Sequence, residues 1–408
     1  MLSFEDARAK VIEVVTACAC PPQIEAVDLA REPAVALGRI LAEDIVADRN
    51  YPPFDRSIRD GYALRAADAA APGARLRLIG ESRAGVAFNG KVCAGECVRI
   101  MTGAPVPKGA NAVVMLEVTR ADGDEIVLEQ AVRPSQYLVL TGAEARVGEI
   151  VVKRGTRLGY AELAMAAEVG HADLHLSRRP RVAILSTGDE LVELGETPGP
   201  YQIRNSNNVS LASQVMLARG EPILAGHAVD LAAELRAAIE RAMEADIVLL
   251  SGGVSAGKYD LVEQVLHDMG AEVFFDAVAI RPGRPAVFAS YEGKPVFGLP
   301  GNPVSTMVTF ELFVRPAIEV LSGLEPPALP LFKAVLAHPV KEKGAVAHFL
   351  PARVTWQSGE PVVETLLWEG SGDIGAVVRS NCFLLVRDSK LQLEAREWVD
   401  VLARRGAV

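Results

Sequence analysis

The sequence predicts a multidomain protein that combines α/β and β domains, and three observations lead to this prediction. The chain has 408 residues, which exceeds the size of one ordinary domain. Residues 179–325 alternate short aliphatic runs with helical patterns, which is typical of a three-layer α/β domain with a mostly parallel sheet. Residues 51–140 and 331–408 instead carry short β-type runs between Gly and Pro, which is typical of mainly β domains.

The remaining segments, 1–50 and 141–178, mix helix and strand patterns on either side of the first β domain. A helix is expected over "FEDARAKVIEVVTAC" near the N-terminus, and a strand, a turn and a helix are expected over "GEIVVKRGTRLGYAELAMAAEVG". The simplest organisation is one discontinuous N-terminal domain, 1–50 with 141–178, into which the β domain 51–140 is inserted.

The α/β segment can be divided into elements in chain order. A strand "RVAIL", a helix over about 206–219 and a strand "EPILAGHAV" come first. The next helix, "LAAELRAAIERAMEA", places five apolar residues on one face: Leu231, Leu235, Ala238, Ile239 and Ala242. A strand "DIVLL", a helix near 259–269, three further strands and the helix "VSTMVTFELFVRPAIEVL" complete the unit. The linker "SGLEPPALP" then precedes the C-terminal β domain, 331–408.

Composition restricts the class of protein. Half of the residues are hydrophobic, 23% are charged and the net charge is −10, without a basic block. Nucleic-acid binding is therefore not expected. The N-terminal apolar run "VIEVVTACAC" is short and interrupted by Glu13, so neither a signal peptide nor a membrane span is expected.

Cysteine usage predicts a cytoplasmic protein with free thiols, because the count is odd and sparse for this length. No second Cys or His pair follows Cys93 and Cys97 at a zinc-ligand spacing, so a zinc site is not expected. The five cysteines are Cys18, Cys20, Cys93, Cys97 and Cys382.

The loop "SGGVSAGKYD" (251–260) matches two catalytic patterns and satisfies neither. As a P-loop, with Gly252, Gly257 and Lys258, it lacks the Ser or Thr after the Lys that ligates magnesium. As a nucleophile elbow, with Gly253 and Ser255, it places the Ser about five residues beyond the strand end, and no His is marked as its partner.

The more general prediction is a site for anionic ligands at the carboxyl edge of the sheet. Three further segments, 185–190, 279–285 and 298–305, also join Gly to polar groups just after a strand. Asp189, Glu190 and Asp260 supply oxygens suited to Mg²⁺. Arg281 and Arg284 supply planar guanidinium groups for an oxyanion or a phosphate. Each residue alone is more typical of a helix cap or a surface ion pair than of a ligand site, but four such loops together favour a pocket.

Longer motifs resemble the molybdopterin molybdenumtransferase family, which includes bacterial MoeA and the gephyrin E domain. The resemblance spans nearly the whole chain in order. It rests on these segments: "PPFDRSIRDGYALRAAD" (52–68), "VRIMTGAPVPKGANAVVMLE" (98–117), "VAILSTGDELVELG" (182–195), "LLSGGVSAGKYD" (249–260), "AIRPGRPAVFA" (279–289), "VFGLPGNPVSTMVTFELFVRP" (296–316) and "GSGDIGAVVRSNCFLLV" (370–386).

The resemblance implies an elongated discontinuous domain, a β domain, an α/β molybdopterin-binding domain and a C-terminal β-barrel-like domain. It implies insertion of molybdate into adenylylated molybdopterin with Mg²⁺-dependent release of AMP. It also implies a homodimer whose cleft combines the α/β domain of one subunit with the β domain of the other, with proteins of molybdenum-cofactor synthesis as possible partners.

Carried over by position, the resemblance implies three groups of site residues. The catalytic group is Asp60, Thr102, Glu144, Asp230 and Asp260. The metal ligands are Asp189, Glu190 and Asp260. The substrate-binding group is Ser186, Thr187, Gly188, Gly252, Gly253, Ser255, Gly257, Lys258, Arg281, Arg284, Pro300, Gly301, Asn302, Pro303 and Ser305.

Three departures from the family pattern affect this assignment. Glu144 stands where relatives often have Asp, and Arg281 and Arg284 stand where many have Lys. Pro351 stands where many have Arg, with Arg353 two residues further on. Three alternatives stay open: a scaffold without turnover, the related adenylyltransferase step, which would leave half of the chain unexplained, and a preference for tungstate.

Overall fold

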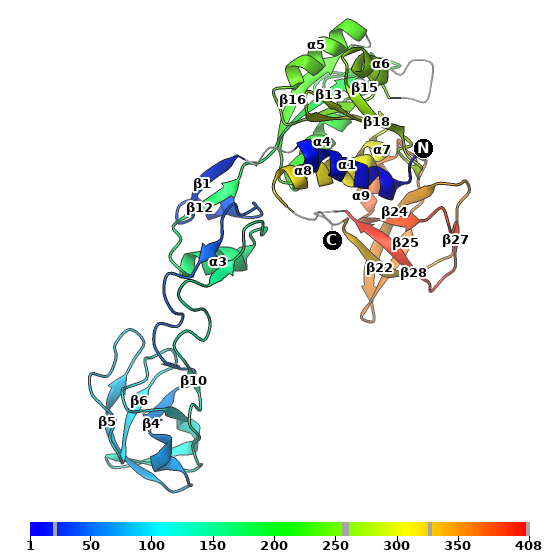
Figure 1. The fold of residues 1–408 in the computed structure, drawn as a ribbon. Coiled ribbons are helices and arrows are strands. Elements are labelled where there is room, and N and C mark those ends of the chain that lie inside the picture. The colour runs from blue at the N-terminus through cyan, green and yellow to red at the C-terminus, as the bar shows by residue number, and fades with distance from the viewer. Residues whose placement is uncertain (19–22, 230, 255–260, 325–328, 405–408) are drawn as a thin grey trace.

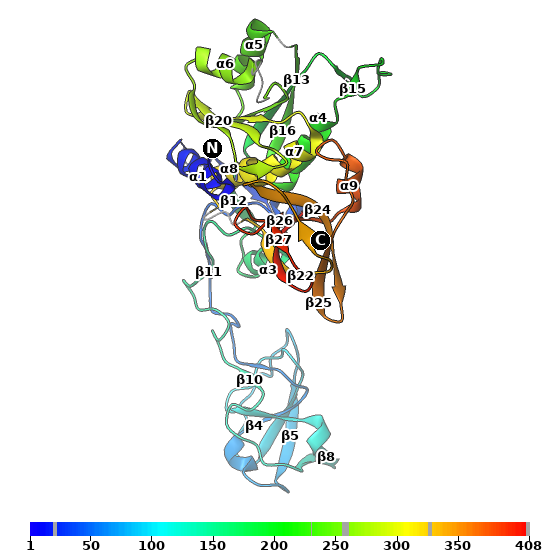
Figure 2. The same ribbon diagram turned by 90° about the vertical axis from the view of Figure 1, so that its right-hand side faces the viewer.

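The computed structural model describes residues 1–18, 23–229, 231–254, 261–324 and 329–404. The molecule is elongated, with a body at one end, a narrow arm and a small β domain at the far end of the arm (Figure 1, Figure 2). We use "tip" for the β domain 51–140, "arm" for 23–50 with 141–178, and "body" for the remainder. The expected four-part fold, with an elongated discontinuous domain, is confirmed.

The α/β part of the body is a three-layer unit around a six-stranded sheet. Its order is β16 (Glu221–Ala228), β13 (Arg181–Thr187), β17 (Ile247–Ser251), β21 (Lys294–Leu299), β20 (Pro285–Tyr291) and β18 (Glu272–Ala277). The first four strands are parallel, whereas β20 is antiparallel to both of its neighbours. The sheet is therefore mostly parallel, and the carboxyl ends of β13, β17 and β21 meet at one edge.

Helices cover both faces of this sheet, and each face has its own apolar core. One layer contains α5 (Ala232–Ala242) and α6 (Leu261–Asp268). The other contains α4 (Ser206–Leu217), α7 (Pro303–Thr309), the π-helical turn η3 (Phe310–Val314) and α8 (Arg315–Leu321). A short parallel pair, β14 (Leu191–Val192) with β15 (Ile203–Arg204), precedes α4.

The N-terminal helix forms as expected but packs in a different place. Helix α1 (Phe4–Cys18) contacts α8 and η3, and Phe4 packs edge-on against Phe349 at 5.4 Å between ring centroids. Its buried face, which includes Val11 and Val15, belongs to the body core. Helix α1 therefore packs with the body and not with the arm, because its apolar stripe is buried against the α/β layer.

The arm consists of antiparallel strand pairs and two helices. β1 (Ile24–Asp28) pairs with β12 (Asp173–Ser177), and β2 (Ile45–Val46) pairs with β11 (Ile150–Val152). The helices are α2 (Pro33–Ala36) and α3 (Tyr160–Glu168). Each pair joins the outgoing and the returning chain, so the inserted tip is held by a two-way connection.

The tip is a six-stranded sheet with a separate short pair. Its order is β7 (Ala112–Met115), β4 (Gly61–Leu64), β6 (Glu96–Ile100), β5 (Arg75–Ser82), β9 (Glu125–Leu128) and β8 (Thr119–Asp122). The 3₁₀ turns η1 (Ala66–Ala69) and η2 (Leu116–Val118) connect strands, and β3 (Arg56–Ser57) pairs with β10 (Leu138–Val139).

The C-terminal part of the body is a five-stranded barrel. β24 (Ala347–Gln357), β25 (Glu360–Thr365), β22 (Leu331–Leu336), β28 (Trp398–Ala403) and β26 (Cys382–Val386) close on one another through the β24–β26 pairing. β19 (Ile280–Arg281) from the α/β part adds to β24 in parallel. A short pair, β23 (Val340–Lys341) with β27 (Gln392–Leu393), and α9 (Ile374–Arg379) complete it. No helix in the described part of the chain is both long and apolar enough to cross a membrane.

Candidate functional site

The predicted loops interlock at the carboxyl edge of the sheet. The backbone N–H of Gly252 donates to Leu299 O at 3.1 Å, which fixes the end of β17 against the end of β21. Asn207 bridges the same two loops, because its Nδ2 donates to Ser251 Oγ at 2.9 Å and to Gly301 O at 2.8 Å. Segments more than forty residues apart in sequence therefore form one continuous surface.

This surface lines a cavity of about 400 Å³, which we call the strand-end cavity. Nine of the predicted site residues line it: Thr187, Gly188, Glu190, Gly252, Gly253, Pro300, Gly301, Asn302 and Pro303. The N-terminus of α4, with Asn205, Ser206 and Asn207, forms another wall. Exposed backbone N–H groups at a helix N-terminus favour an anionic ligand there.

Two buried polar atoms in this cavity have no hydrogen-bond partner among the described residues. They are Thr187 Oγ1 and Asn207 Oδ1. Thr187 itself is only 3% exposed. Because buried polar atoms are normally paired, these two atoms indicate contacts that a bound ligand would complete.

Ser186 has a different position from its neighbour. It is fully buried, and its Oγ accepts a hydrogen bond from Asn205 Nδ2 at 2.7 Å. Asn205 in turn caps α4, since its side chain accepts from the backbone N–H of Asn208. Ser186 therefore orients the helix N-terminus and does not line the cavity.

A second cavity of about 690 Å³ adjoins the first and lies between the α/β unit and the barrel. We call it the arginine cavity, because Arg281 and Arg284 line it together with Ser305. Pro285, Pro300 and Asn302 line both cavities. The two spaces are thus adjacent parts of one site.

The barrel contributes the other wall of the arginine cavity. Glu342, His348, Glu369 and Ser371 line it, and the backbone N–H of Val304 donates to Ser371 O at 2.9 Å. This hydrogen bond joins the start of α7 to the barrel. Substrate bound here would be enclosed by both parts of the body.

Arg353 does not take the place of the arginine that many relatives have at position 351. Its guanidinium donates from Nε and Nη2 to Arg379 O at 3.1 and 2.7 Å. Neither it nor Pro351 lines the arginine cavity. Among the described residues, the cationic side chains of the arginine cavity are therefore Arg281, Arg284 and, when protonated, His348.

Asp60 and Thr102 meet on the tip, although 42 residues separate them. Asp60 Oδ1 accepts from the backbone N–H of Thr102 at 2.7 Å and from its Oγ1 at 3.1 Å. These two hydrogen bonds lower the pKa of Asp60 below its ordinary value, so the carboxylate is ionised at neutral pH. Gly61 is required beside it, because a Cβ there would lie 1.8 Å from Val114 O.

Glu144 lies where the chain returns from the tip to the arm. Its carboxylate pairs with Arg56 on β3, and its backbone N–H donates to Tyr51 O at 2.9 Å. It is half-exposed, so the carboxylate is accessible to a ligand despite the ion pair. Asp60 and Thr102 thus lie on the tip, the part of the chain at the far end of the arm (Figure 1), and Glu144 lies where the tip joins the arm.

Asp189 and Glu190 follow β13 and are exposed at the edge of the sheet. The carboxylate of Glu190 lies against Gly188, where a Cβ would come within 2.6 Å of Glu190 Oε2. Within the described residues, no group of three or more His, Cys, Asp or Glu side chains forms a metal cluster. Asp230, Ser255, Gly257, Lys258 and Asp260 lie outside the described residues.

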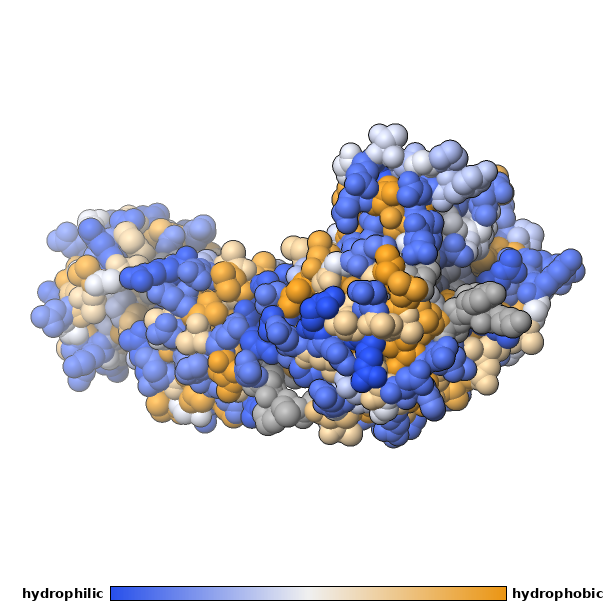
Figure 3. All heavy atoms as spheres, turned by 90° about the horizontal axis from the view of Figure 1, so that it is seen from above, coloured by the Kyte–Doolittle hydropathy of each residue, from blue (hydrophilic) through white to orange (hydrophobic). Residues whose placement is uncertain are grey.

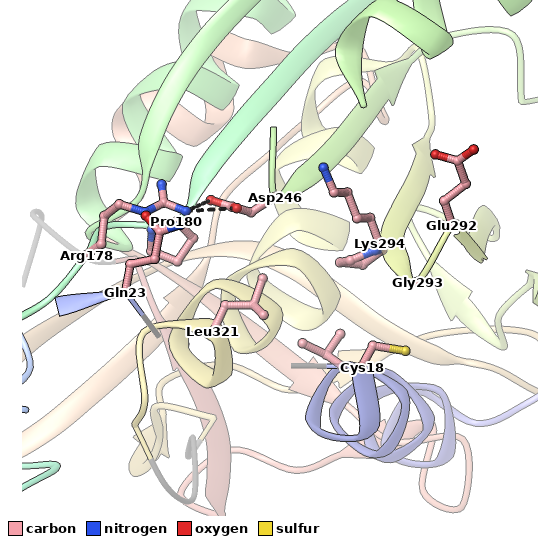
Figure 4. Close-up of a pocket in the computed structure, with 11 residues that line it drawn as sticks. Cys18, Gln23, Arg178, Pro180, Asp246, Glu292, Gly293, Lys294 and Leu321 are labelled. Atoms are coloured by element: carbon pink, nitrogen blue, oxygen red, sulfur yellow. Dashed lines mark hydrogen bonds and ion pairs between the residues drawn. The ribbon is translucent and has the colours of Figure 1, made fainter. Parts of the chain in front are cut away.

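A third cavity, of about 340 Å³, lies at the opposite, amino-terminal edge of the sheet (Figure 4). Arg178 and Asp246 form a bidentate ion pair there, at 2.9 and 2.8 Å, and Lys294 points its ammonium to Met243 O. Three of its charged groups, Arg178, Asp246 and Lys294, are thus engaged with the protein. None of the predicted site residues lines this cavity.

The sequence analysis missed Asn205, Asn207, Glu342 and His348. The run "RNSNN" (204–208) carried a usable signal, since Asn is a preferred helix cap and this helix begins at the carboxyl edge. His348 and Glu342 carried no such signal. Only the pairing of β19 with β24 brings the barrel to the Arg loop.

Gly252→Ala should weaken ligand binding at the strand-end cavity. Gly252 has φ of +98°, and a Cβ would lie 2.5 Å from Thr187 O, so two loops of the site would have to separate. Strain of this kind costs about 1–3 kcal/mol. The matched control is Gly226→Ala, where φ is +97° and no atom lies within 4 Å. Equilibrium dialysis with a nucleotide probe measures binding by the two variants. Equal binding by Gly252→Ala and Gly226→Ala would contradict the expected clash.

The fold and the cavities define a class of protein: a multidomain protein with a cavity between an α/β domain and a β-barrel, lined by groups that suit an anionic ligand. Family models match the chain in three consecutive parts. Residues 2–170 match the MoeA N-terminal region (domain I and II), residues 183–320 a probable molybdopterin binding domain, and residues 333–403 the MoeA C-terminal region (domain IV).

Relatives match over nearly the full length. A molybdopterin molybdenumtransferase of Haemophilus influenzae is 35% identical over 98% of each chain, and one of Bacillus subtilis is 34% identical over 91% of this chain and 88% of its own. The molybdopterin biosynthesis MoeA protein of Pyrococcus horikoshii OT3 has a TM-score of 0.83 and 30% identity, with 99% of this chain and 100% of that chain covered. The chain belongs to the molybdopterin molybdenumtransferase family.

Proposed function

We propose that this protein inserts molybdate into adenylylated molybdopterin and releases AMP, yielding molybdenum cofactor. The observation that carries the proposal is the pair of adjoining cavities, which share Pro285, Pro300 and Asn302. One offers backbone N–H groups and unpaired buried oxygens, and the other offers two guanidinium groups. This pair suits a nucleotide-linked ligand beside a small oxyanion.

In this proposal the strand-end cavity holds the phosphates of the adenylylated pterin. Thr187, Gly252 and the N-terminus of α4 would hydrogen-bond the phosphate oxygens. Arg281 and Arg284 would hold molybdate, because planar guanidinium groups bind tetrahedral oxyanions through paired N–H donors. The protein would hold both anions close together and partly shielded from water, which favours transfer between them.

Mg²⁺ fits the acids at the end of β13. Asp189 and Glu190 offer hard carboxylate oxygens beside the strand-end cavity, and Asp260 would be a third ligand. When bound, the ion would neutralise phosphate charge as the AMP leaves. The sparse set of free thiols supports a cytoplasmic setting for this chemistry.

We further propose that the active cleft is shared within a homodimer. Asp60 and Thr102 lie on the tip and Glu144 lies where the tip joins the arm, so within one chain the three residues are remote from the cavities of the body (Figure 1). Hydrophobic side chains also reach the surface of the body and the arm (Figure 3). On the body they include residues of α4 and of the edge strand β16, where Met216, Leu217 and Leu224 are 47–62% exposed. A second copy covering this face would bury apolar surface and bring its tip toward the site.

The test is AMP release from adenylylated molybdopterin by the purified protein with Mg²⁺, titrated with molybdate and, separately, with tungstate. Release that depends on either oxyanion supports the transferase and ranks the two metals. Tight binding of the adenylylated pterin without release would favour a scaffold that has lost turnover.

Arg284→Ala should raise the molybdate concentration needed for half-maximal AMP release by about 10–100-fold, since a hydrogen bond to a charged group contributes about 1.5–3 kcal/mol. Binding of the adenylylated pterin should change much less. Arg353→Ala is the control, because its guanidinium donates to Arg379 O outside the cavity. A larger effect on pterin binding than on molybdate dependence would assign Arg284 to the phosphate instead.

A further inference from the structure

We propose that His348 is a proton-linked cationic group of the oxyanion site: it is neutral in the free protein and takes up a proton when a tetrahedral dianion enters the arginine cavity. The inference rests on the proposed function of this cavity as the molybdate site. It adds a third, pH-dependent cation to Arg281 and Arg284.

The strand pairing places His348 beside one of the two arginines. β19 and β24 are parallel, and Arg281 is the register partner of His348. Register partners on adjacent strands project to the same face of a sheet. Both residues line the arginine cavity, so a ligand held by Arg281 would lie in the cavity that the imidazole lines.

The imidazole is buried and poorly satisfied by the protein. His348 has no exposed surface, and neither ring nitrogen makes a well-formed hydrogen bond within the described residues. Its nearest acid is Glu342, whose Oε2 lies 3.0 Å from Nδ1. Glu342 thus accompanies Nδ1, whereas Nε2 has no hydrogen-bond partner among the described residues, so Nε2 is the atom at which a ligand contact is expected.

Burial, rather than the surrounding charges, is the main reason that the pKa of the ring is low when the cavity holds no anion. Burial lowers the pKa of His348, and Arg281 lowers it further, while Glu342 and the backbone of Lys343 act in the opposite direction. Arg284 and Glu369 complete the charged groups that line the cavity. A bound dianion would offset both arginines and favour the imidazolium.

Proton uptake and oxyanion affinity are then reciprocally linked. In the free protein the pKa of His348 lies below the ordinary value of about 6.5. Dianion binding raises it. Between the pKa of His348 in the free protein and its pKa in the bound protein, the dissociation constant of the oxyanion should fall as the pH falls. The decrease should be at most about tenfold per pH unit, because one proton is taken up.

The experiment is calorimetric titration of the full-length protein with micromolar molybdate across pH 5.5–8, roughly the range in which histidine titrates. Two buffers with different heats of ionisation count the protons exchanged on binding. We expect uptake approaching one proton and tighter binding at lower pH. At the high end of this pH range, His348→Gln should bind molybdate as the wild type does. Across the range it should lose both the proton uptake and the pH dependence of molybdate affinity.

Glu342→Gln provides a second variant that keeps the histidine. Removing this carboxylate lowers the pKa of His348 in both states, so the window of proton uptake should move to lower pH. Unchanged proton uptake in His348→Gln, or an unmoved window in Glu342→Gln, would overturn the inference. The inference would also be overturned if Arg284→Ala weakens molybdate binding but binding by the wild type takes up no proton. That outcome would leave the proposed function intact. Absence of molybdate binding at every pH would overturn the proposed function together with the inference.

Discussion

Asp60→Ala and Arg284→Ala homodimers should each release little AMP at a molybdate concentration that supports the wild type but lies well below the requirement of Arg284→Ala. When the two are mixed and allowed to exchange subunits at that concentration, they should regain about a quarter of wild-type AMP release. In a dimer with a shared cleft, each cleft combines the tip of one chain with the body of the other. A mixed dimer therefore has one cleft with both substitutions and one with neither. Random exchange makes half of the dimers mixed.

The structure gives the physical basis for this expectation. Asp60 is held by Thr102 on the tip, and Arg284 lines a cavity of the body, so the two substitutions affect opposite ends of one chain. The matched control mixes Asp60→Ala with Thr102→Ala. Every cleft then receives a defective tip, so no activity should return. Recovery in this control, or a monomeric protein by light scattering, would contradict the shared cleft.

Glu311→Ala should destabilise the body by about 3–5 kcal/mol, which is the usual cost of leaving one partner of a buried ion pair unpaired. Arg315 is 1% exposed, and its Nη2 donates to Glu311 Oε1 at 2.7 Å. Gln214 from α4 donates to the same oxygen at 3.0 Å. The pair thus joins α4 to the segment that follows α7, directly behind the site loops.

The control is a pair of the same residue types at the same spacing. Arg236 and Glu240 on α5 are also four residues apart, at 3.0 Å, but both are about half exposed. Glu240→Ala should cost only about 0.3–0.5 kcal/mol, because solvent screens the pair. Urea unfolding, detected by hydrogen exchange of α4 and α8, measures the loss of stability in both variants. Equal losses of unfolding free energy in the two variants would show that the burial of Arg315 does not determine the cost of removing its partner.

The strand and helix order of the α/β unit could be read from periodicity, because each element carries its own apolar face. The helix expected over "LAAELRAAIERAMEA" is α5, and Leu235, Ala238, Ile239 and Ala242 are its buried residues. Helix α1 was also predicted correctly as a helix. The surface against which α1 packs could not be predicted, because an apolar stripe indicates that a helix is buried but not which surface covers it.

The same distinction applies to the site. The Gly loops after β13, β17 and β21 were predicted to converge, because parallel strands end at one edge. Thr187, Gly252 and Asn302 do line one cavity there. His348 was not predicted, because it enters the site through the β19–β24 pairing between domains, which no local pattern encodes.

The sequence by itself determined the elements, their order, the family and the chemistry of the edge loops, since these depend on local spacing and on residue type. Tertiary structure alone decided which cations share the arginine cavity, where α1 packs and how far Asp60 lies from the body. The physical reason is that long-range contacts depend on which faces are buried together. The free energy of that burial is a property of the packed pair rather than of either segment.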